Sequence, residues 1–231
     1  MKFASLKSIY DKFFHITQTG HPSRSDWWAR ERLSLLKRHG YLKSARVSFS
    51  GTSYYLATDL AHTALITLAN SSGRSFVRPL HAVDIRTFEH DRLVMEARLA
   101  LESEGRARDW LSERRLKSEA ALSFGLAREF QPDAIYRNKF SESVAFELEI
   151  SVKSRERYQD KIRKYVEVMR EHEGLDQGLK GVLFVTVHEN VFKTLTELTE
   201  RYGGKFRIER LEALLTKSRV ESLQTFTEGV S

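Results

Sequence analysis

Residues 143–152, SVAFELEISV, place two glutamates inside a run of apolar side chains, and this segment restricts the fold most. Successive side chains of a β-strand face opposite ways, so Glu147 and Glu149 share one face and the apolar residues beside them share the other. Carboxylates this close repel one another unless something positive lies near them. The strand therefore needs cations or a metal ion on its acidic face.

The segment after this strand supplies positive charge. Residues 153–172 have the spacing of an amphipathic helix, and at 100° per residue two separate stripes form. The apolar stripe, predicted to pack on the sheet, consists of Tyr158, Ile162, Tyr165 and Met169. The basic row, whose members lie within roughly 80° of one another, consists of Lys153, Arg157, Lys161 and Lys164.

A third carboxylate is expected at the same end of the sheet. Asp133 begins the segment PDAIY, and if this segment pairs beside SVAFELEISV, Asp133 approaches Glu147 and Glu149. Carboxylate oxygens in this number suit Mg²⁺ or Mn²⁺. The alternative is a solvated edge strand whose glutamates point outward and pair with the lysines, and the spacing leaves both interpretations open.

The remaining segments predict an α/β domain with a central mixed β-sheet flanked by helices. A long charged helix is expected over about 84–105, and further helices over 153–172 and 190–202. The predicted strands, in chain order, are ARDWLSERRL, PDAIYRN, SVAFELEISV, GVLFVTV and KFRIER.

The N-terminal quarter carries nearly all the excess positive charge. Of a net charge of +7, residues 1–60 hold ten Lys and Arg against four acids. A helix over 3–16, a second helix capped by Ser23 or Ser25 and ending near His39, and a hairpin in YLKSARVSFSGTSYYLATDLA together predict a winged helix-turn-helix. We expect this domain and a connector in 1–75, and the α/β domain in 76–231.

A basic winged helix is typical of a module that binds double-stranded DNA. A protein-binding or dimerising winged helix is the alternative, and Trp27 and Trp28 fit core or interface positions better than base stacking. The candidate DNA contacts are Arg24, Ser25, Trp27, Arg30, Arg32, Lys43, Arg46 and Thr52, with Arg157 and Lys164 in the second domain.

Composition excludes several classes of site. There is no cysteine, so thiol nucleophiles, zinc ribbons and iron–sulfur ligation are excluded. The N-terminus has no signal-peptide core, and no run of 18 apolar residues occurs. We expect a soluble cytoplasmic protein without a membrane partner.

These residues resemble a nuclease superfamily. Pro132-Asp133, Glu147-x-Glu149 and Lys153, inside this order of helices and strands, resemble the PD-(D/E)xK nucleases. The usual E-x-K is replaced by E-x-E, which puts the role of Lys153 in doubt more than the metal site.

A broader resemblance covers most of the chain. The segments HAVDIRTFEHDRLVMEARLAL, WLSERRL, PDAIYR and FELEISVKSRERYQDKIRKY are similar to the replication-relaxation family and the related MOBC-class plasmid relaxases. The resemblance implies a winged helix joined to a metal-dependent domain that nicks DNA at a plasmid origin. Glu113 falls on the family's acid in "SER", and Lys161 and Tyr165 fall on its K-x-x-x-Y.

We therefore expect a metal-dependent DNA endonuclease or relaxase. Its expected catalytic residues are Asp133, Glu147, Glu149, Lys153 and Lys161, and its expected Mg²⁺ or Mn²⁺ ligands are Asp133, Glu147, Glu149 and Glu113. The eight histidines include no H-x-H pair, which disfavours the histidine-cluster relaxase mechanism, although Tyr158 or Tyr165 stays open as a nucleophile. A non-catalytic replication or transcription regulator and a restriction or repair endonuclease are the alternatives. The sequence also leaves open a homodimer or a plasmid-processing complex.

Overall fold

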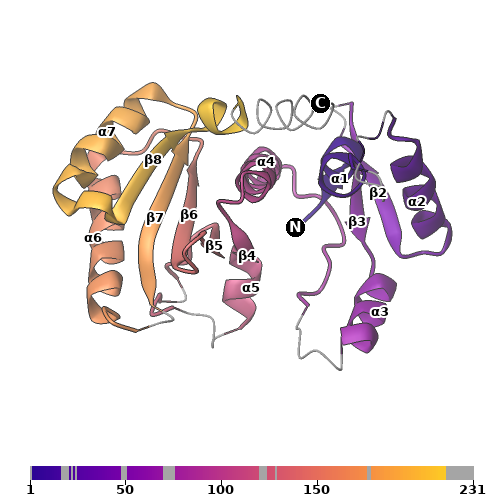
Figure 1. Cartoon of the computed structure of the whole chain (residues 1–231), viewed down its shortest axis with the longest axis horizontal. Coiled ribbons are helices and arrows are strands. Elements are labelled where there is room, and N and C mark those ends of the chain that lie inside the picture. Colours follow the sequence, from indigo (N-terminus) through magenta and orange to yellow (C-terminus); the bar gives the residue numbers. More distant parts are fainter. Residues whose placement is uncertain are drawn as a thin grey trace. The chain divides into compact units, whose positions relative to one another are not determined.

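The computed structural model describes residues 2–16, 21, 23, 25–47, 51–69, 76–119, 124–127, 129–175 and 178–216. The chain forms two compact units, Met1–Leu99 and Ala100–Ser231 (Figure 1). Across these described segments no helix combines the length and the apolar character needed to cross a membrane. The chain is α/β with a mixed sheet and helices, as the sequence predicts.

The first unit contains a small antiparallel sheet and the predicted order of helix, helix and hairpin. Its strands lie in the order β1-β3-β2, with a short strand added before the first helix. The strands are β1 (Ala4–Ser5), β2 (Leu42–Arg46) and β3 (Ser53–Ala57). The helices are α1 (Leu6–Phe13), α2 (Trp27–Arg38), α3 (Asp59–Ala69) and α4 (Phe88–Ser103), and α4 continues into the second unit.

The first unit extends well past the boundary that we expected near residue 75. Phe88, at the start of α4, is 1% exposed and belongs to the same apolar core as Phe3 and Tyr54. Its ring stacks on Phe3 with centroids 5.4 Å apart and meets the edge of Tyr54 at 5.1 Å. Because this contact fixes the start of α4 to the first unit, the division falls inside that helix.

The start of α2 differs from the expectation. Asp26, and not Ser23 or Ser25, is the N-cap residue, but its carboxylate forms no capping bond because it pairs with Arg30 one turn on. Trp27 and Trp28 are 53% and 65% exposed, so neither occupies the core of this unit.

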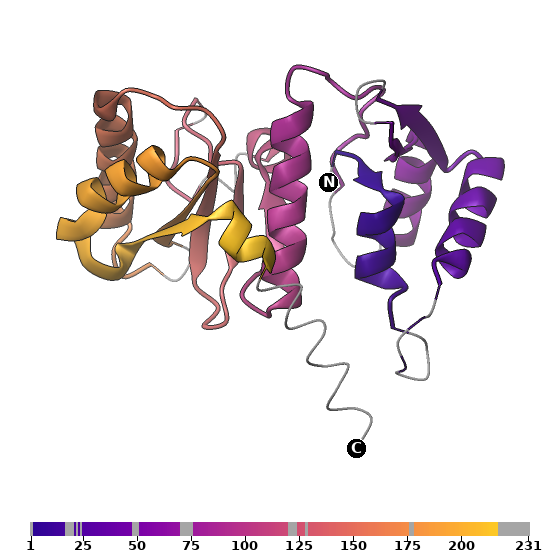
Figure 2. The same ribbon diagram turned by 90° about the horizontal axis from the view of Figure 1, so that it is seen from above.

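The second unit is built on a five-stranded sheet in the order β4-β5-β6-β7-β8. The first three strands are antiparallel neighbours, whereas β6, β7 and β8 are parallel. Both views show α6 and α7 on the same side of this sheet (Figures 1 and 2). The strands are β4 (Arg108–Ser112), β5 (Ala134–Arg137), β6 (Ser143–Glu149), β7 (Leu179–Thr186) and β8 (Phe206–Arg210). The helices are α5 (Glu113–Ser118), α6 (Arg155–Glu171), α7 (Glu189–Thr199) and the 3-10 helix η2 (Glu200–Lys205).

The helix after β6 buries the apolar stripe that the sequence predicts. Tyr158, Ile162, Tyr165 and Met169 are each at most 4% exposed and pack against the sheet. One predicted strand was too long: ARDWLSERRL is a strand only to Ser112, and the chain then enters α5. The segment ERRLKS contains strong helix formers, which favours the change.

Candidate functional site

Asp133 and Glu147 lie opposite each other where β5 and β6 run side by side. The pairing ends at Ala134 and Phe146, and Asp133 and Glu147 are the next residue of each strand's chain, close enough for the charge of Asp133 to raise the pKa of Glu147. The backbone N–H of Leu148 donates to Asp133 Oδ2 at 2.8 Å. The sequence prediction that these acids approach each other agrees with this geometry.

Glu113 is connected to Asp133 through a backbone hydrogen bond. Its N–H donates to the carbonyl oxygen of Asp133 at 2.9 Å, next to the paired residues Ser112 and Ala134. Its carboxylate, however, accepts a hydrogen bond from Lys117 at 2.5 Å. Glu113 is therefore near the acids, but its side chain is engaged elsewhere.

The two glutamates of β6 are buried in the centre of the sheet. Glu147 is 6% exposed and Glu149 is 1% exposed. This burial excludes the solvated edge strand that we considered from the spacing, because β6 lies third of five strands. That interpretation also predicted ion pairs between the glutamates and lysines, and these ion pairs are present.

Lys161 of α6 connects both glutamates. Its Nζ lies 3.0 Å from Glu147 Oε2 and 2.7 Å from Glu149 Oε1. Lys153 precedes the helix and donates to the other oxygen of Glu149 at 2.6 Å. The predicted basic row is thus divided, since Arg157 and Lys164 remain exposed on the helix surface.

Tyr165 also belongs to this buried cluster, although the sequence placed it on the apolar stripe of the helix. Its hydroxyl donates to Glu147 Oε1 at 2.5 Å, while Lys161 binds Glu147 Oε2. The two side chains are four residues apart and so share one helix face. The K-x-x-x-Y spacing, which the sequence analysis gave as part of the family resemblance, is the signal for this shared contact with Glu147.

Burial and charge shift the pKa values of Glu147, Lys161 and Tyr165. Burial raises the pKa of Glu147 to about 7, although the positive charge of Lys161 opposes the rise. Burial alone would lower the pKa of Lys161, but Glu147 and Glu149 more than offset this effect and raise it. Burial, followed by the charge of Glu147, raises the pKa of Tyr165 well above its usual value.

The carboxylates of Glu147 and Glu149 are paired with lysines of the protein itself. Within the described ranges, no three Asp, Glu or His side chains form a group arranged to hold a metal ion. The ammonium group of Lys161 lies between the two glutamates instead.

The candidate DNA contacts of the first unit are mostly on its surface. Arg30 pairs with Asp26 at 2.7 Å, and Lys43 donates to the carbonyl oxygen of His81 at 2.6 Å. Arg24 lies outside the described residues. The exposed candidates are Ser25, Trp27, Arg30, Arg32, Arg46 and Thr52.

A family model described as replication-relaxation matches residues 12–186, from within α1 to the end of β7. The chain belongs to the replication-relaxation family. No curated protein and no solved structure gives a significant match.

In this replication-relaxation protein, motifs that are distant in sequence meet at one carboxylate. Lys161 and Tyr165, the two ends of K-x-x-x-Y, both contact Glu147. The acid of "SER", Glu113, forms a backbone bond to Asp133, the acid that faces Glu147. These segments therefore form one local structure around Glu147.

Proposed function

We propose that this replication-relaxation protein is a metal-dependent DNA endonuclease or relaxase that nicks one strand at a plasmid origin. The observation that carries the proposal is the facing pair Asp133 and Glu147, with Lys161 beside them. Family membership indicates a role in plasmid replication or relaxation. In this proposal the second unit is a PD-(D/E)xK-like nuclease domain.

The first unit is proposed to be a winged helix-turn-helix that binds double-stranded DNA. Two helices followed by a β-hairpin have the order of that motif, with α2 as the recognition helix. The exposed side chains of Arg30 and Arg32 on α2 support this assignment, because phosphate contacts need accessible cations. The wing would be β2 and β3, with Arg46 and Thr52 near its tip.

The donor chemistry of the buried acids fits Mg²⁺ or Mn²⁺. Mg²⁺ is commonly bound through one or two carboxylates together with substrate phosphates, so a three-carboxylate group is not needed. Asp133 and Glu147 would hold the ion, while Glu149 stays with Lys153 and Lys161. When bound, the ion supplies an activated water and neutralises charge on the phosphate.

The side chains of α6 would then act on the same phosphate. Lys161 carries a firmly held positive charge, which stabilises negative charge that develops on the phosphate oxygens. Tyr165 fixes one oxygen of Glu147 and so orients that carboxylate. Tyr165 is fully buried with a raised pKa, and Tyr158 is 1% exposed, so hydrolysis is favoured over a tyrosine nucleophile.

One observation favours a second candidate, a non-catalytic DNA-binding regulator. Lys161 already neutralises Glu147 and Glu149, as a structural ion pair would. In that case the carboxylates stabilise the second unit and the protein acts only through DNA binding. The two candidates differ in whether the chain cuts DNA.

Nicking of supercoiled plasmid DNA that carries the origin separates these functions. We expect the intact chain to convert it to the open circular form in Mg²⁺ or Mn²⁺ and not in EDTA. Glu147→Ala should abolish nicking, because it removes a proposed ligand of the metal ion. Asp160→Ala, which removes an exposed carboxylate of α6, is the control. No nicking by the intact chain in Mg²⁺ or Mn²⁺ would favour the regulator, and equal nicking rates for Glu147→Ala and the control would mean that Glu147 does not hold the metal ion.

A further inference from the structure

A second charged surface lies in the same unit, at the end of the sheet away from the acids. The strand register defines this end, because Arg108 pairs with Arg137, Arg137 with Ser143, and Ser143 with Leu179. Glu147 and Glu149 lie toward the other end of β6, beside Phe184 and Thr186. Arg207 pairs with Leu183, which pairs with Phe146, the residue before Glu147. The two surfaces are therefore separated mainly by the sheet itself, because successive side chains of a strand point to opposite faces.

Six cations gather at this end of the sheet and on the adjoining part of the sheet face that carries Arg207, and we call them the basic strip. They come from four strands or from the residues next to them: Arg108, Arg137, Lys139, Lys180, Lys205 and Arg207. Neighbouring strands are about 4.8 Å apart, so five strands give the strip a width on the order of 20 Å. That width suits a chain-like ligand more than a single small ion.

Most of this charge is not neutralised by carboxylates. Among the described residues, Lys139, Lys180 and Lys205 have no ion-pair partner. Arg108 donates to Ser141 Oγ and Arg137 to Ser141 O, at 2.8 Å for the second bond, and both acceptors are neutral. Arg207 is the exception, since it pairs with Glu209. The strip is thus ready for an external anion.

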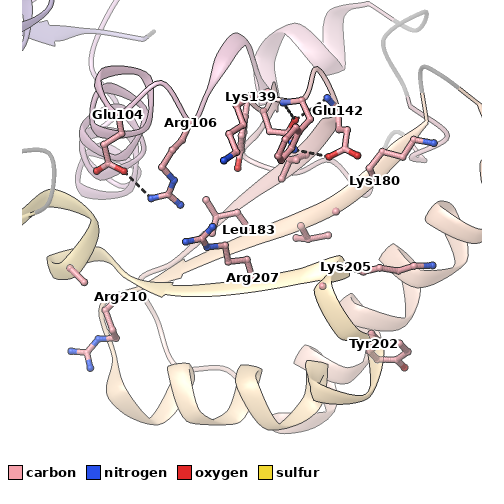
Figure 3. A pocket seen from close by; sticks show the side chains of 18 of the residues that line it. Glu104, Arg106, Lys139, Glu142, Lys180, Leu183, Tyr202, Lys205, Arg207 and Arg210 are labelled. Carbon is pink, nitrogen blue, oxygen red and sulfur yellow. Dashed lines mark hydrogen bonds and ion pairs between the residues drawn. The ribbon is translucent and has the colours of Figure 1, made fainter. Parts of the chain in front are cut away.

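The strip borders an open groove of about 1450 Å³. Figure 3 shows Lys180 and Lys205 extending to the same side of this groove, with Arg207 beside Leu183. Glu104, Glu142 and Glu212 also line the groove, and Glu142 keeps its charge because its partner Asn138 is neutral. The same lining holds six lysines and arginines against these three acids. The groove therefore keeps an excess of positive charge.

Aromatic rings are interleaved with these cations. Phe140, at the turn between β5 and β6, is 70% exposed, and Lys139 Nζ lies 4.9 Å from its ring centroid. Tyr202 also lines the groove, with the guanidinium of Arg201 4.8 Å from its ring. In single-stranded DNA the bases can stack on exposed aromatic rings while the phosphates bind cations. In a closed duplex the base faces are already stacked on one another and cannot reach such rings.

We infer that the basic strip and its groove bind single-stranded DNA, with Phe140 as a stacking position. This site goes beyond the proposed nicking function, since it uses neither the first unit nor the buried acids. Lys180 and Lys205 bind the backbone phosphates, and Phe140 stacks on a base. The site is sequence-tolerant, because every base has a face that can stack.

Fluorescence anisotropy with a short oligothymidylate, in EDTA, tests this inference without requiring cleavage. We expect Lys180→Ala combined with Lys205→Ala to weaken binding about tenfold and to lower the salt slope by about 1.4, at about 0.7 per lost phosphate contact. Phe140→Ala should weaken binding about fivefold with an unchanged slope, because stacking involves no counterions. Lys193→Ala, an exposed lysine of α7, is the charge control.

Three results would overturn the inference. The first is an intact chain that does not bind the oligothymidylate. The second is a double lysine variant that binds as the Lys193→Ala control does. The third is an equal loss of affinity for a hairpin duplex, which would make the strip a duplex-binding surface. Each of these binding results can be measured and interpreted whether or not the chain nicks DNA.

Discussion

Helix α2 carries four basic side chains and α6 carries six, and one of the six, Lys161, lies in an environment that no cation of α2 shares. On α2, Arg30 is 63% exposed and pairs only with Asp26 of its own helix, which is 37% exposed. On α6, Lys161 is 21% exposed and contacts two glutamates that are at most 8% exposed. Residue type alone therefore does not determine what a cation does in this molecule.

The difference predicts distinct responses to perturbation. Exposed ion pairs contribute little to stability and are screened by salt, so the charge of α2 remains available for an external polyanion. Breaking a buried pair leaves an uncompensated charge and is strongly destabilising. We therefore expect salt to weaken the proposed DNA binding by exposed cations, and substitutions of the buried charges to lower the stability of the second unit.

The largest expected effect is that of Glu149→Lys. This change restores the E-x-K of the nuclease superfamily, but it would place a third ammonium group beside Lys153 and Lys161. We expect the free energy of unfolding to fall by about 3–5 kcal/mol, as for other buried pairs that lose one partner. Urea unfolding followed by circular dichroism measures it. Asp160→Lys, which reverses the charge of an exposed carboxylate of α6, is the matched control, and a Glu149→Lys variant as stable as that control would contradict the buried-cluster account.

Tyr165→Phe should have a smaller effect on the same cluster. Glu147 loses one donor but keeps Lys161, so the free energy of unfolding should fall by about 1.5–3 kcal/mol, the range for hydrogen bonds to charged groups. Nicking should slow but persist. Complete loss of nicking in a folded variant, together with a covalent protein–DNA adduct in the wild type, would instead identify Tyr165 as a nucleophile.

Arg32→Ala on α2 should alter DNA binding and leave stability unchanged. The side chain is exposed, and losing one phosphate contact on duplex DNA lowers the salt slope by about 0.9. Titration of a duplex at several salt concentrations gives this slope. Lys7→Ala on α1, whose lysine pairs with Asp11, is the control. If both variants gave the wild-type slope, α2 would not be the DNA-binding helix.

The smallest expected effect is that of Asp133→Ala on DNA affinity without metal. Removing a negative charge near the bound phosphate should leave the affinity equal or raise it slightly, by about twofold at most. Anisotropy titrations in EDTA measure it. A clear loss of affinity would mean that Asp133 contributes to DNA binding and not to metal binding.

Periodicity and spacing predicted most elements of the second unit, because strands and amphipathic helices carry strong local signals. The strand with Glu147 and Glu149 and the apolar stripe of α6 are confirmed. The end of β4 at Ser112 was missed, although the helix formers of ERRLKS are a local signal for α5.

Other features depend on tertiary contacts that no local pattern reveals. The attachment of α4 to the first unit rests on Phe88 meeting Phe3 and Tyr54. The basic strip draws its cations from separate strands, so its charges are diluted in the sequence. The exposure of Trp28 was also unexpected, because helical spacing alone made it available for packing.

The central claim is that Asp133 and Glu147 hold a divalent metal ion, and anomalous scattering from Mn²⁺ tests it most directly. Crystals of the intact chain would be soaked in Mn²⁺ at a concentration that supports nicking. We predict a Mn²⁺ peak between the carboxylates of Asp133 and Glu147, with the Lys161 ammonium group shifted toward Glu149. A map with no peak at that position, and Lys161 still bound to both glutamates, would contradict the account.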